Sequence, residues 1–467
     1  MMKKLNHWFF VVAALATLVS CKTTAEVKYV FYFIGDGTGI NQVYGTQNFN
    51  AATGLDPVNF TTFPVQSFIT TRSSSSWVTD SAAGGTALAT GHKTYNDAIG
   101  VDADVQPVSS LVEWAHANGY GTGVCTTVGV NHATPASFYA HTERRGNYED
   151  ISTQYLSAPV DFAAGGGFIK QRGSDKDNAY FIRASEEAGI RVLRGPDFRG
   201  VADTDGRVLC LSGKDEDDVP YAIDRKEDDT QLCDFVQAGI DYLEARFGDK
   251  GFFFMIEGGK IDYAGHGNDA ATLVHEVNDM AAAVDLALAF CERHPDETLI
   301  VITADHETGG LMLGSGKYEM KPELLLNQKV SKPVLTEKFR ETFFPEGARR
   351  VAPDWLQVKE FFRENLGLWE AVPVNEQAEA KLRGVYDDTL GKGRDLGEAN
   401  MYAVNSALVV AAVDLLNHAA GYKFSFGSHS GSPVGLYVQG KGWERFTDVK
   451  DNTEIAPLIA ELAGYKH

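Results

Sequence analysis

Short apolar runs alternate with amphipathic stretches along most of this chain, and the alternation predicts an α/β protein. The apolar runs are bounded by turn-forming residues, which is typical of buried strands. They are Lys28–Ile34, Tyr120–Val128, Val160–Ala164, Phe252–Ile256, Leu299–Thr303 and Val434–Val438. The predicted helices are Ala82–Thr90, Ser109–Ala117, Thr230–Phe247, a long helix after Asn268, and Tyr402–Ala420. We therefore expect a three-layer sandwich, with a central mostly parallel sheet and helices on both faces.

The long helix after Phe252–Ile256 is predicted to begin at Asn268 as its N-cap. Apolar residues from Leu273 onward fall on one face of that helix. His275 and Glu276 are interpreted as solvated surface residues, because no second histidine stands where a zinc-protease helix requires one.

Residues 317–400 differ from the rest because they are polar, mostly helical in pattern and poor in strand candidates. We interpret them as a cap- or crown-like insertion over one end of the sheet. The catalytic domain would then comprise residues 28–316 and 401–467. The alternative is that 317–400 form a small separate domain.

The first 20 residues have the pattern of an export signal. Lys3 and Lys4 precede the apolar run Trp8–Val19, and the run ends beside Cys21. This order resembles a bacterial lipoprotein signal, with Cys21 as the lipidated residue and 21–27 as a tether. The alternative is a plain secretory signal. Both predict an exported protein; the first makes it a cell-envelope lipoprotein on the periplasmic side of a membrane or on the cell surface, bound to the membrane only through its lipid.

Charge and cysteine content narrow the function classes. The formal net charge of −21 makes binding to a nucleic-acid polymer improbable, although it does not exclude a small anionic substrate. Export permits disulfides. Cys210 and Cys233 flank an Asp-rich segment and could pair, whereas Cys125 and Cys291 are predicted to be buried thiols.

Polar residues follow the predicted strands at the points where the strands end. Because ligands bind beyond the carboxyl ends of strands in open α/β sheets, these residues are expected at one shared edge. Imidazole with carboxylate suits zinc, while carboxylate and hydroxyl oxygens suit magnesium. The candidates are Asp36, His132, Thr134, Glu257, Asp262, His266, Asp305 and His306.

Ser81 is the candidate nucleophile, because it begins the small-residue helix Ala82–Thr90. A serine there would face a substrate phosphate together with free backbone N–H groups. The alternative for Ser81 is a helix N-cap without a chemical role.

Four segments carry a resemblance to a known family. Ile34–Gly39 (IGDGTG), Val78–Ala83 (VTDSAA), Glu257–Asp262 (EGGKID) and Val301–His306 (VITADH) resemble, in family order, the signature segments of alkaline phosphatases. The resemblance runs from about Tyr29 to Val438 and is weakest across the insertion and Gly165–Thr230.

The resemblance implies two zinc ions and one magnesium ion. Ser81 would form a phosphoserine intermediate. The zinc that activates Ser81 would be held by Asp36, Asp305 and His306, and the other zinc by Asp262, His266 and His429. Asp36, Thr134 and Glu257 match the magnesium site.

Arg145 lies at the family spacing from His132 for the arginine that grips two phosphate oxygens, with the adjacent Arg144 as the alternative. His132 stands beside the magnesium site, where members carry Asp or His, and it could bias that site toward zinc. Tyr263 stands where members often carry Lys or His, so substrate preference is expected to differ.

The resulting prediction is a phosphomonoesterase acting on small phosphate monoesters. One alternative is a sister hydrolase that cleaves phosphodiesters or sulfates; such relatives generally lack counterparts of Thr134, Glu257 and Arg145. The other is a non-catalytic phosphate- or metal-binding lipoprotein. The resemblance also makes a homodimer possible.

Overall fold

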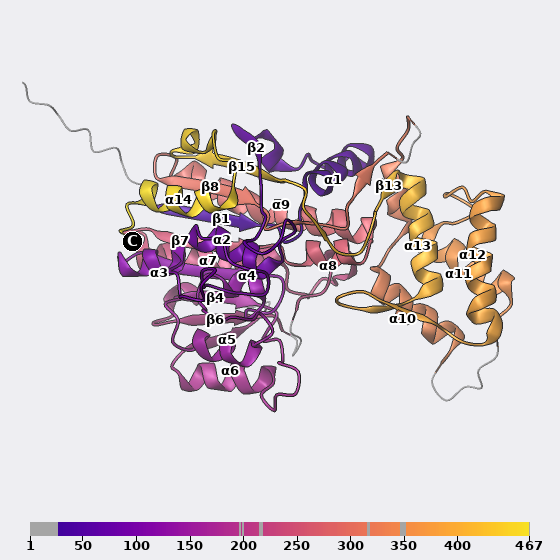
Figure 1. Ribbon diagram of the computed structural model, residues 1–467, viewed down its shortest axis with the longest axis horizontal. Coiled ribbons are helices and arrows are strands. Elements are labelled where there is room, and N and C mark those ends of the chain that lie inside the picture. Colours follow the sequence, from indigo (N-terminus) through magenta and orange to yellow (C-terminus); the bar gives the residue numbers. More distant parts are fainter. Residues whose placement is uncertain are drawn as a thin grey trace, which may run out of the picture.

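A computed structural model describes residues 27–195, 198, 200–213, 218–314, 318–345 and 352–466 (Figure 1). The predicted signal peptide and nearly all of the tether lie outside the described residues. Among those described, none of the helices combines the length and apolar character needed to cross a membrane.

A nine-stranded sheet forms the centre of the molecule, and the predicted α/β architecture is confirmed. Only β15 runs against the others, since it pairs antiparallel with both of its neighbours, β2 and β8. The remaining pairs are parallel. In spatial order the strands are β2 (Val65–Ile69), β15 (Val434–Gly440), β8 (Thr298–Thr303), β1 (Tyr29–Ile34), β7 (Phe252–Glu257), β3 (Gly121–Thr126), β4 (Phe162–Gly165), β6 (Val208–Leu211) and β5 (Arg191–Arg194).

The central strands are aligned in register, so that their carboxyl ends meet at one edge. Ile34, the last residue of β1, pairs with Glu257 of β7 on one side and with Thr303 of β8 on the other. Thr126 of β3 also pairs with Glu257. The segments that follow β1, β3, β7 and β8 therefore leave the sheet side by side.

Helices cover both faces of the sheet, because alternate side chains of each buried strand point to opposite faces. Phe31 and Phe33 join one apolar cluster, while Val30 and Tyr32 join the other. The first cluster is covered by α1 (Ile40–Thr53), α7 (Leu232–Phe247) and α9 (Ala270–Arg293). The second is covered by α2 (Ser81–Thr90), α3 (Leu111–Ala117) and α14 (Ile455–Ala463).

The segment between β8 and β15 builds a mostly helical group beside the sheet (Figure 1). It contains α10 (Lys332–Phe343), α11 (Trp355–Leu366), α12 (Glu376–Asp388) and α13 (Ala407–Ala420). Between α12 and α13 the strands β11 (Gly397–Ala399) and β12 (Val404–Ser406) form an antiparallel hairpin. Phe339, Phe362 and Leu408 belong to the same apolar cluster as the first sheet face, so this group shares a continuous core with the sheet.

The shorter elements lie around these layers. Two small pairs, β9 with β14 and β10 with β13, are antiparallel. The remaining elements are α4 (Ala133–Ala136), α5 (Tyr148–Tyr155), α6 (Asn178–Glu187), α8 (Lys260–His266), β9 (Glu307–Thr308), β10 (Met312–Leu313), β13 (Tyr422–Lys423) and β14 (His429–Ser430).

Three local predictions are wrong. Asp269, not Asn268, caps α9, because its carboxylate accepts the Thr272 N–H, while Asn268 adopts a φ of 49° in the turn after α8. Glu276 is buried rather than solvated, since it accepts the N–H of Ala222 from the loop that crosses α9. The helix predicted from Tyr402 begins only at Ala407, because the residues before it belong to the β11–β12 hairpin.

Whether Cys210 and Cys233 pair, which the sequence left open, is answered by the structure, since the four cysteines in the described part of the chain are free thiols. Cys210 is buried within β6, and Cys233 is half-buried in the first turn of α7. Cys125 and Cys291 are buried, as predicted.

Candidate active site

The carboxyl edge of the sheet gathers the residues predicted for the site. Asp36 follows β1, Asp305 follows β8, Glu257 ends β7, and Thr134 lies in α4 just beyond β3. All four side chains are fully buried. The register of β1, β7 and β8 explains their proximity, because it places the three strand ends at the same level.

Ser81 is the first residue of α2 and is not the helix cap. Asp80 takes that role, since its Oδ1 accepts the Ala83 N–H at 3.0 Å. The Ser81 hydroxyl instead lies 3.1 Å from His306 Nε2. This placement removes the capping interpretation and leaves the hydroxyl directed at the residues that follow β8.

Two glycines let α2 pack directly against the site. A Cβ at Gly84 would lie 2.9 Å from the carbonyl oxygen of Asp305, and a Cβ at Gly85 would lie 2.9 Å from Ser137 Oγ in the next turn after α4. The small-residue character of α2 is therefore a requirement of close packing, which overrides its low helix propensity.

The first cluster of potential metal ligands consists of Asp36, Asp305 and His306. His306 Nε2 lies 3.4 Å from Asp36 Oδ1 and 3.4 Å from Asp305 Oδ2. The Gly37 N–H holds Asp305 by donating to its Oδ1 at 3.2 Å. Ser81 Oγ faces His306 Nε2, which belongs to this cluster. A cation bound here would therefore lie beside the serine hydroxyl.

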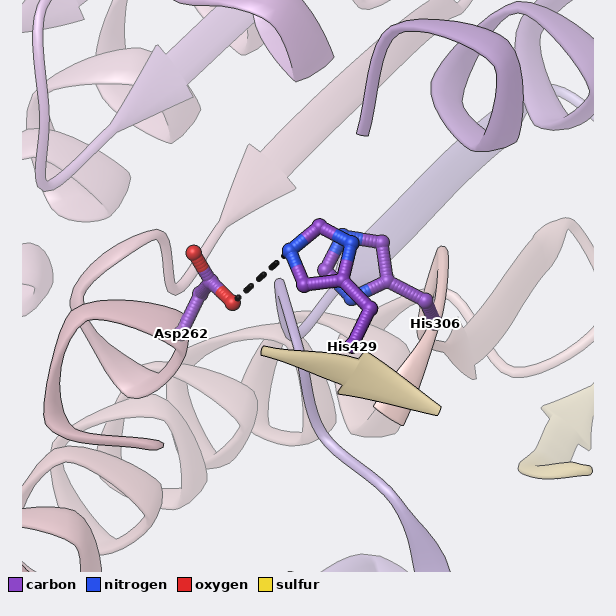
Figure 2. A group of neighbouring side chains, drawn as sticks. All are labelled: Asp262, His306 and His429. Carbon is purple, nitrogen blue, oxygen red and sulfur yellow. Dashed lines mark ion pairs between the residues drawn. The ribbon is translucent and has the colours of Figure 1, made fainter. Parts of the chain in front are cut away.

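The second cluster combines Asp262 of α8 with His429 of β14, and His306 borders it (Figure 2). Asp262 Oδ1 lies 3.7 Å from His429 Nε2, and the His306 and His429 rings stack with centroids 3.5 Å apart. His429 reaches this position because β14 pairs with β9, which follows His306 directly.

His266 completes the second cluster. Its Nε2 lies 3.1 Å from His429 Nε2 and 3.4 Å from Asp262 Oδ2. In both histidines Nδ1 meets a backbone carbonyl, that of Gly427 for His266 and that of Thr79 for His429. Donation by Nδ1–H leaves each Nε2 lone pair available to a cation, which is the usual arrangement of metal-binding imidazoles.

The third cluster consists of Asp36, His132 and Glu257. Thr134 Oγ1 donates to Asp36 Oδ2 at 3.3 Å, so the predicted threonine lies within the same cluster. Within the described residues, Asp36 Oδ1, Glu257 Oε1 and His132 Nδ1 are buried without a hydrogen bond. A buried polar atom without a partner lowers the stability of the folded state. A bound cation would pair with these three atoms through their lone pairs, so they fit a metal site.

Burial and mutual repulsion shift the ionisation of these groups. Burial, then Asp305 and Asp262, raises the pKa of Asp36 well above its usual range. Burial also raises the pKa of Glu257 to about 8 and that of Asp305 to about 6. Burial lowers the pKa of His132 to about 3. Clustered carboxylates in such an environment are stabilised by a counter-cation, and their charged forms are the ligand forms.

Arg145, and not Arg144, points into the site. The Arg145 side chain is 16% exposed and lies 3.3 Å from both Asp80 Oδ2 and His132 Nε2. The Arg144 side chain is 70% exposed and pairs with the surface residue Asp97. The fork of Arg145 donors is therefore the one available to an oxyanion near Ser81.

Sequence reasoning missed residues that hold Asp262 in place. Tyr402 donates its hydroxyl to Asp262 Oδ2 at 2.9 Å, and Thr308 donates to Asp262 Oδ1 at 2.5 Å. Thr308 carries a local signal, since it follows the VITADH segment by two residues. Tyr402 carries none, because it lies 140 residues from its partner in a stretch that resembles a helix.

A cavity of about 630 Å³ reaches the ligand clusters at His132 and His429. Asp80 and Arg145 also line it. Tyr263, the other predicted departure from the family pattern, lines the same cavity and makes an edge-to-face contact with His132. Four of the predicted site residues, His132, Arg145, Tyr263 and His429, thus border one accessible space.

A mostly parallel sheet whose carboxyl edge carries a serine hydroxyl beside metal-type ligand groups is typical of an α/β enzyme. Comparison with known proteins gives the family. The family model described as alkaline phosphatase matches residues 27–162 and 204–465. Alkaline phosphatase 4 of Bacillus subtilis is 30% identical over 450 residues, which cover 94% of this chain and 89% of that protein.

Solved structures similar to this chain also include alkaline phosphatases. The cold-active alkaline phosphatase of a psychrophilic Shewanella superposes with a TM-score of 0.75 at 28% identity, covering 93% of this chain and 99% of that one. The alkaline phosphatase of the Antarctic bacterium TAB5 gives a TM-score of 0.66 at 27% identity, covering 95% and 100%. The chain belongs to the alkaline phosphatase family, and it is accordingly an enzyme that hydrolyses phosphate monoesters.

Proposed function

We propose that the enzyme hydrolyses phosphate monoesters through a phosphoserine intermediate on Ser81. The observation that carries this proposal is the contact of 3.1 Å between Ser81 Oγ and His306 Nε2 at the start of α2. The Ser81 oxygen would form a bond to phosphorus as the ester oxygen departs with the alcohol, and water would then release phosphate from the serine.

The chain's own groups position the phosphoryl group. Ser81 lies at the N-terminus of α2, and the N-terminus of a helix favours an anion. Arg145 offers parallel N–H donors from the opposite wall, and Asp80 orients the guanidinium. Together these donors would hold the phosphoryl oxygens while the Ser81 side chain approaches phosphorus from the α2 side.

We further propose two zinc ions and one magnesium ion as the cofactors. Asp36, Asp305 and His306 would hold one zinc, and Asp262, His266 and His429 the other. Asp36, Thr134 and Glu257 would hold magnesium, with His132 able to favour zinc there. When bound, these cations would supply Lewis-acid stabilisation of the reacting oxygens. Variants of the TAB5 enzyme in which a histidine is replaced by glutamate or aspartate are described with Mg bound in an M3 site, which supports a third metal site in this fold.

The substrate class is tested with three matched esters that share one leaving group: a phosphate monoester, a phosphate diester and a sulfate. We expect the monoester to be turned over fastest by at least about 100-fold, since Arg145 and the third cluster recognise a dianionic phosphoryl group. A diester or sulfate preference would favour the sister hydrolases, and no turnover of any ester would favour a binding protein.

Replacement of Arg145 by alanine should weaken inorganic phosphate binding and monoester kcat/KM by roughly 10- to 1000-fold, because a bidentate charge-assisted contact is lost. Arg144→Ala is the matched control, since its side chain is exposed and should change both quantities less than about threefold. The measurements are phosphate inhibition and steady-state kinetics. Equal losses in the two variants would contradict the assignment of Arg145.

The export, the lipid anchor at Cys21 and the homodimer remain part of this proposal. The first two rest on residues 1–21, which lie outside the described part of the chain. The insertion at 317–400 and the catalytic domain at 28–316 and 401–467 are likewise proposed as the domain division.

A further inference from the structure

The cavity is much larger than a phosphate group requires. Arg145, proposed to grip phosphate, lines it together with Tyr148, Tyr221, Tyr263 and Tyr402, and we call the part lined by these tyrosines the outer cavity. A volume of about 630 Å³ lies within the range of pockets that bind whole small ligands. The cavity therefore has room for the alcohol part of a substrate as well as for its phosphoryl group.

Tyr402 and Tyr263 form a stacked pair that lines the outer cavity. Their rings are nearly parallel, with an interplanar angle of 16° and centroids 3.5 Å apart. Tyr402 also makes an edge-to-face contact with His266 at 5.3 Å, and its hydroxyl donates to Asp262. The stacked pair thus borders the second ligand cluster directly.

The backbone of Tyr402 is held as firmly as its ring. It lies at the tip of the β11–β12 hairpin, where Asn400 Oδ1 accepts the N–H groups of both Tyr402 and Ala403. Asn400 N–H in turn donates to the Ala403 carbonyl at 2.9 Å. A ring anchored at its backbone and at its hydroxyl is ordered before a ligand arrives, which reduces the entropy lost on binding.

The charged groups of the outer cavity are already paired. Lys260 Nζ donates to Asp218 at 2.9 Å and to the Val219 carbonyl, and it lies over the Tyr221 ring. Lys332 Nζ donates to the carbonyls of Gly267 and Asn268. These partners leave the outer cavity better suited to an uncharged group than to a second phosphate.

We propose that the outer cavity is a leaving-group subsite for an aromatic ring, with Tyr402 and Tyr263 as its specificity-determining residues. The proposal rests on the phosphomonoesterase function described above. It names the preferred substrates as phosphate monoesters whose alcohol carries an aromatic ring. Ring stacking beyond simple apolar burial favours such a group over a saturated ring of similar size.

The test uses phosphonates, which keep the charged head but have no ester bond to break. Binding of phenyl-, cyclohexyl- and methylphosphonate and of inorganic phosphate is measured by calorimetry on the zinc- and magnesium-loaded enzyme. We expect phenylphosphonate to bind roughly 3- to 10-fold more tightly than cyclohexylphosphonate. Tyr402→Ala should bring that ratio close to one. Its inorganic phosphate binding is compared with that of Tyr402→Phe, which loses the same hydroxyl contact to Asp262.

Two further variants separate the ring from the hydroxyl and from general effects. Tyr402→Phe should keep the phenyl preference, since it retains the ring. Tyr318→Ala is the control, because Tyr318 is fully exposed and lies outside the cavity lining. Zinc content and thermal unfolding of each variant show whether the second cluster and the fold are intact.

Two results would overturn the subsite. They are a phenyl-to-cyclohexyl ratio near one in the original enzyme and an unchanged ratio in Tyr402→Ala. The second would make Tyr402 a support of Asp262 alone. If the original enzyme turns over monoesters and binds phosphate while the ratio is near one, only the subsite fails. Absence of both activities would reject the proposed function and the subsite together.

Discussion

Replacement of Ser81 by alanine should lower monoester turnover by at least about 1000-fold, while bound zinc stays nearly unchanged. The physical reason is that the variant lacks the oxygen that accepts the phosphoryl group, and loss of a nucleophile costs several orders of magnitude in other enzymes with covalent intermediates. The variant keeps the side chains of Asp36, Asp305 and His306, which supply the donors of the first cluster. Steady-state kinetics and metal analysis on the same samples check both parts.

Ser74→Ala supplies the matched control for this experiment. Ser74 is an exposed serine of the same loop, and its replacement should leave turnover within about twofold. Full activity in Ser81→Ala would reject the phosphoserine route. Loss of zinc together with activity would instead show that Ser81 supports the ligand cluster.

Removal of metal by a chelator should abolish monoester turnover, with a loss of at least about 100-fold, and lower the apparent Tm by at least about 5 °C. Asp36, Glu257, Asp262 and Asp305 are all fully buried near one another. Without a cation, the repulsion among these carboxylates and their unpaired buried atoms lower the free energy of unfolding. Readdition of zinc and magnesium should restore both quantities, and scanning calorimetry with an activity assay measures them.

The chelated enzyme should also lose stability as the pH rises from 7 to 8. In the folded state Glu257 keeps its proton up to a pKa of about 8, whereas an unfolded glutamate loses it near 4.5. Folding therefore takes up a proton in this window, so higher pH favours the unfolded state by about 1 kcal/mol per pH unit.

Glu257→Gln isolates this effect, because glutamine has no proton to release. The unfolding free energy of the chelated original enzyme, relative to that of chelated Glu257→Gln, should fall as the pH rises between about 5 and 8. Outside this range the difference should be constant. A pH-independent difference would contradict the raised pKa of Glu257. Retention of full activity after complete removal of metal would contradict the proposed cofactors.

The central part of the fold and the site could be predicted because their signals are local. Each core strand is a short apolar run, and a polar residue follows within a few positions of its end. Asp36 follows Ile34 and Asp305 follows Thr303 in this way. Parallel pairing in register then converts separate strand ends into one cluster. The predicted site residues accordingly lie together.

Other features depend on contacts that are distant in sequence. Glu276 looks like a surface residue until the loop at Ala222 covers α9, and the N-cap role passes from Asn268 to Asp269 because α8 ends with a tight turn. Tyr402 appears helical until β11 and β12 pair. Such outcomes are decided by tertiary packing, which overrides local propensity.

The absence of a side chain at Gly84 has a mechanical consequence. Because α2 rests on the backbone of Asp305 with no intervening group, the serine and its neighbouring ligand cluster are carried on surfaces in direct contact. Close-packed protein interiors are only slightly compressible. Thermal displacement of the loop after β8 would therefore move Ser81 along with it. The distance between Ser81 and His306 should then vary little when either element moves.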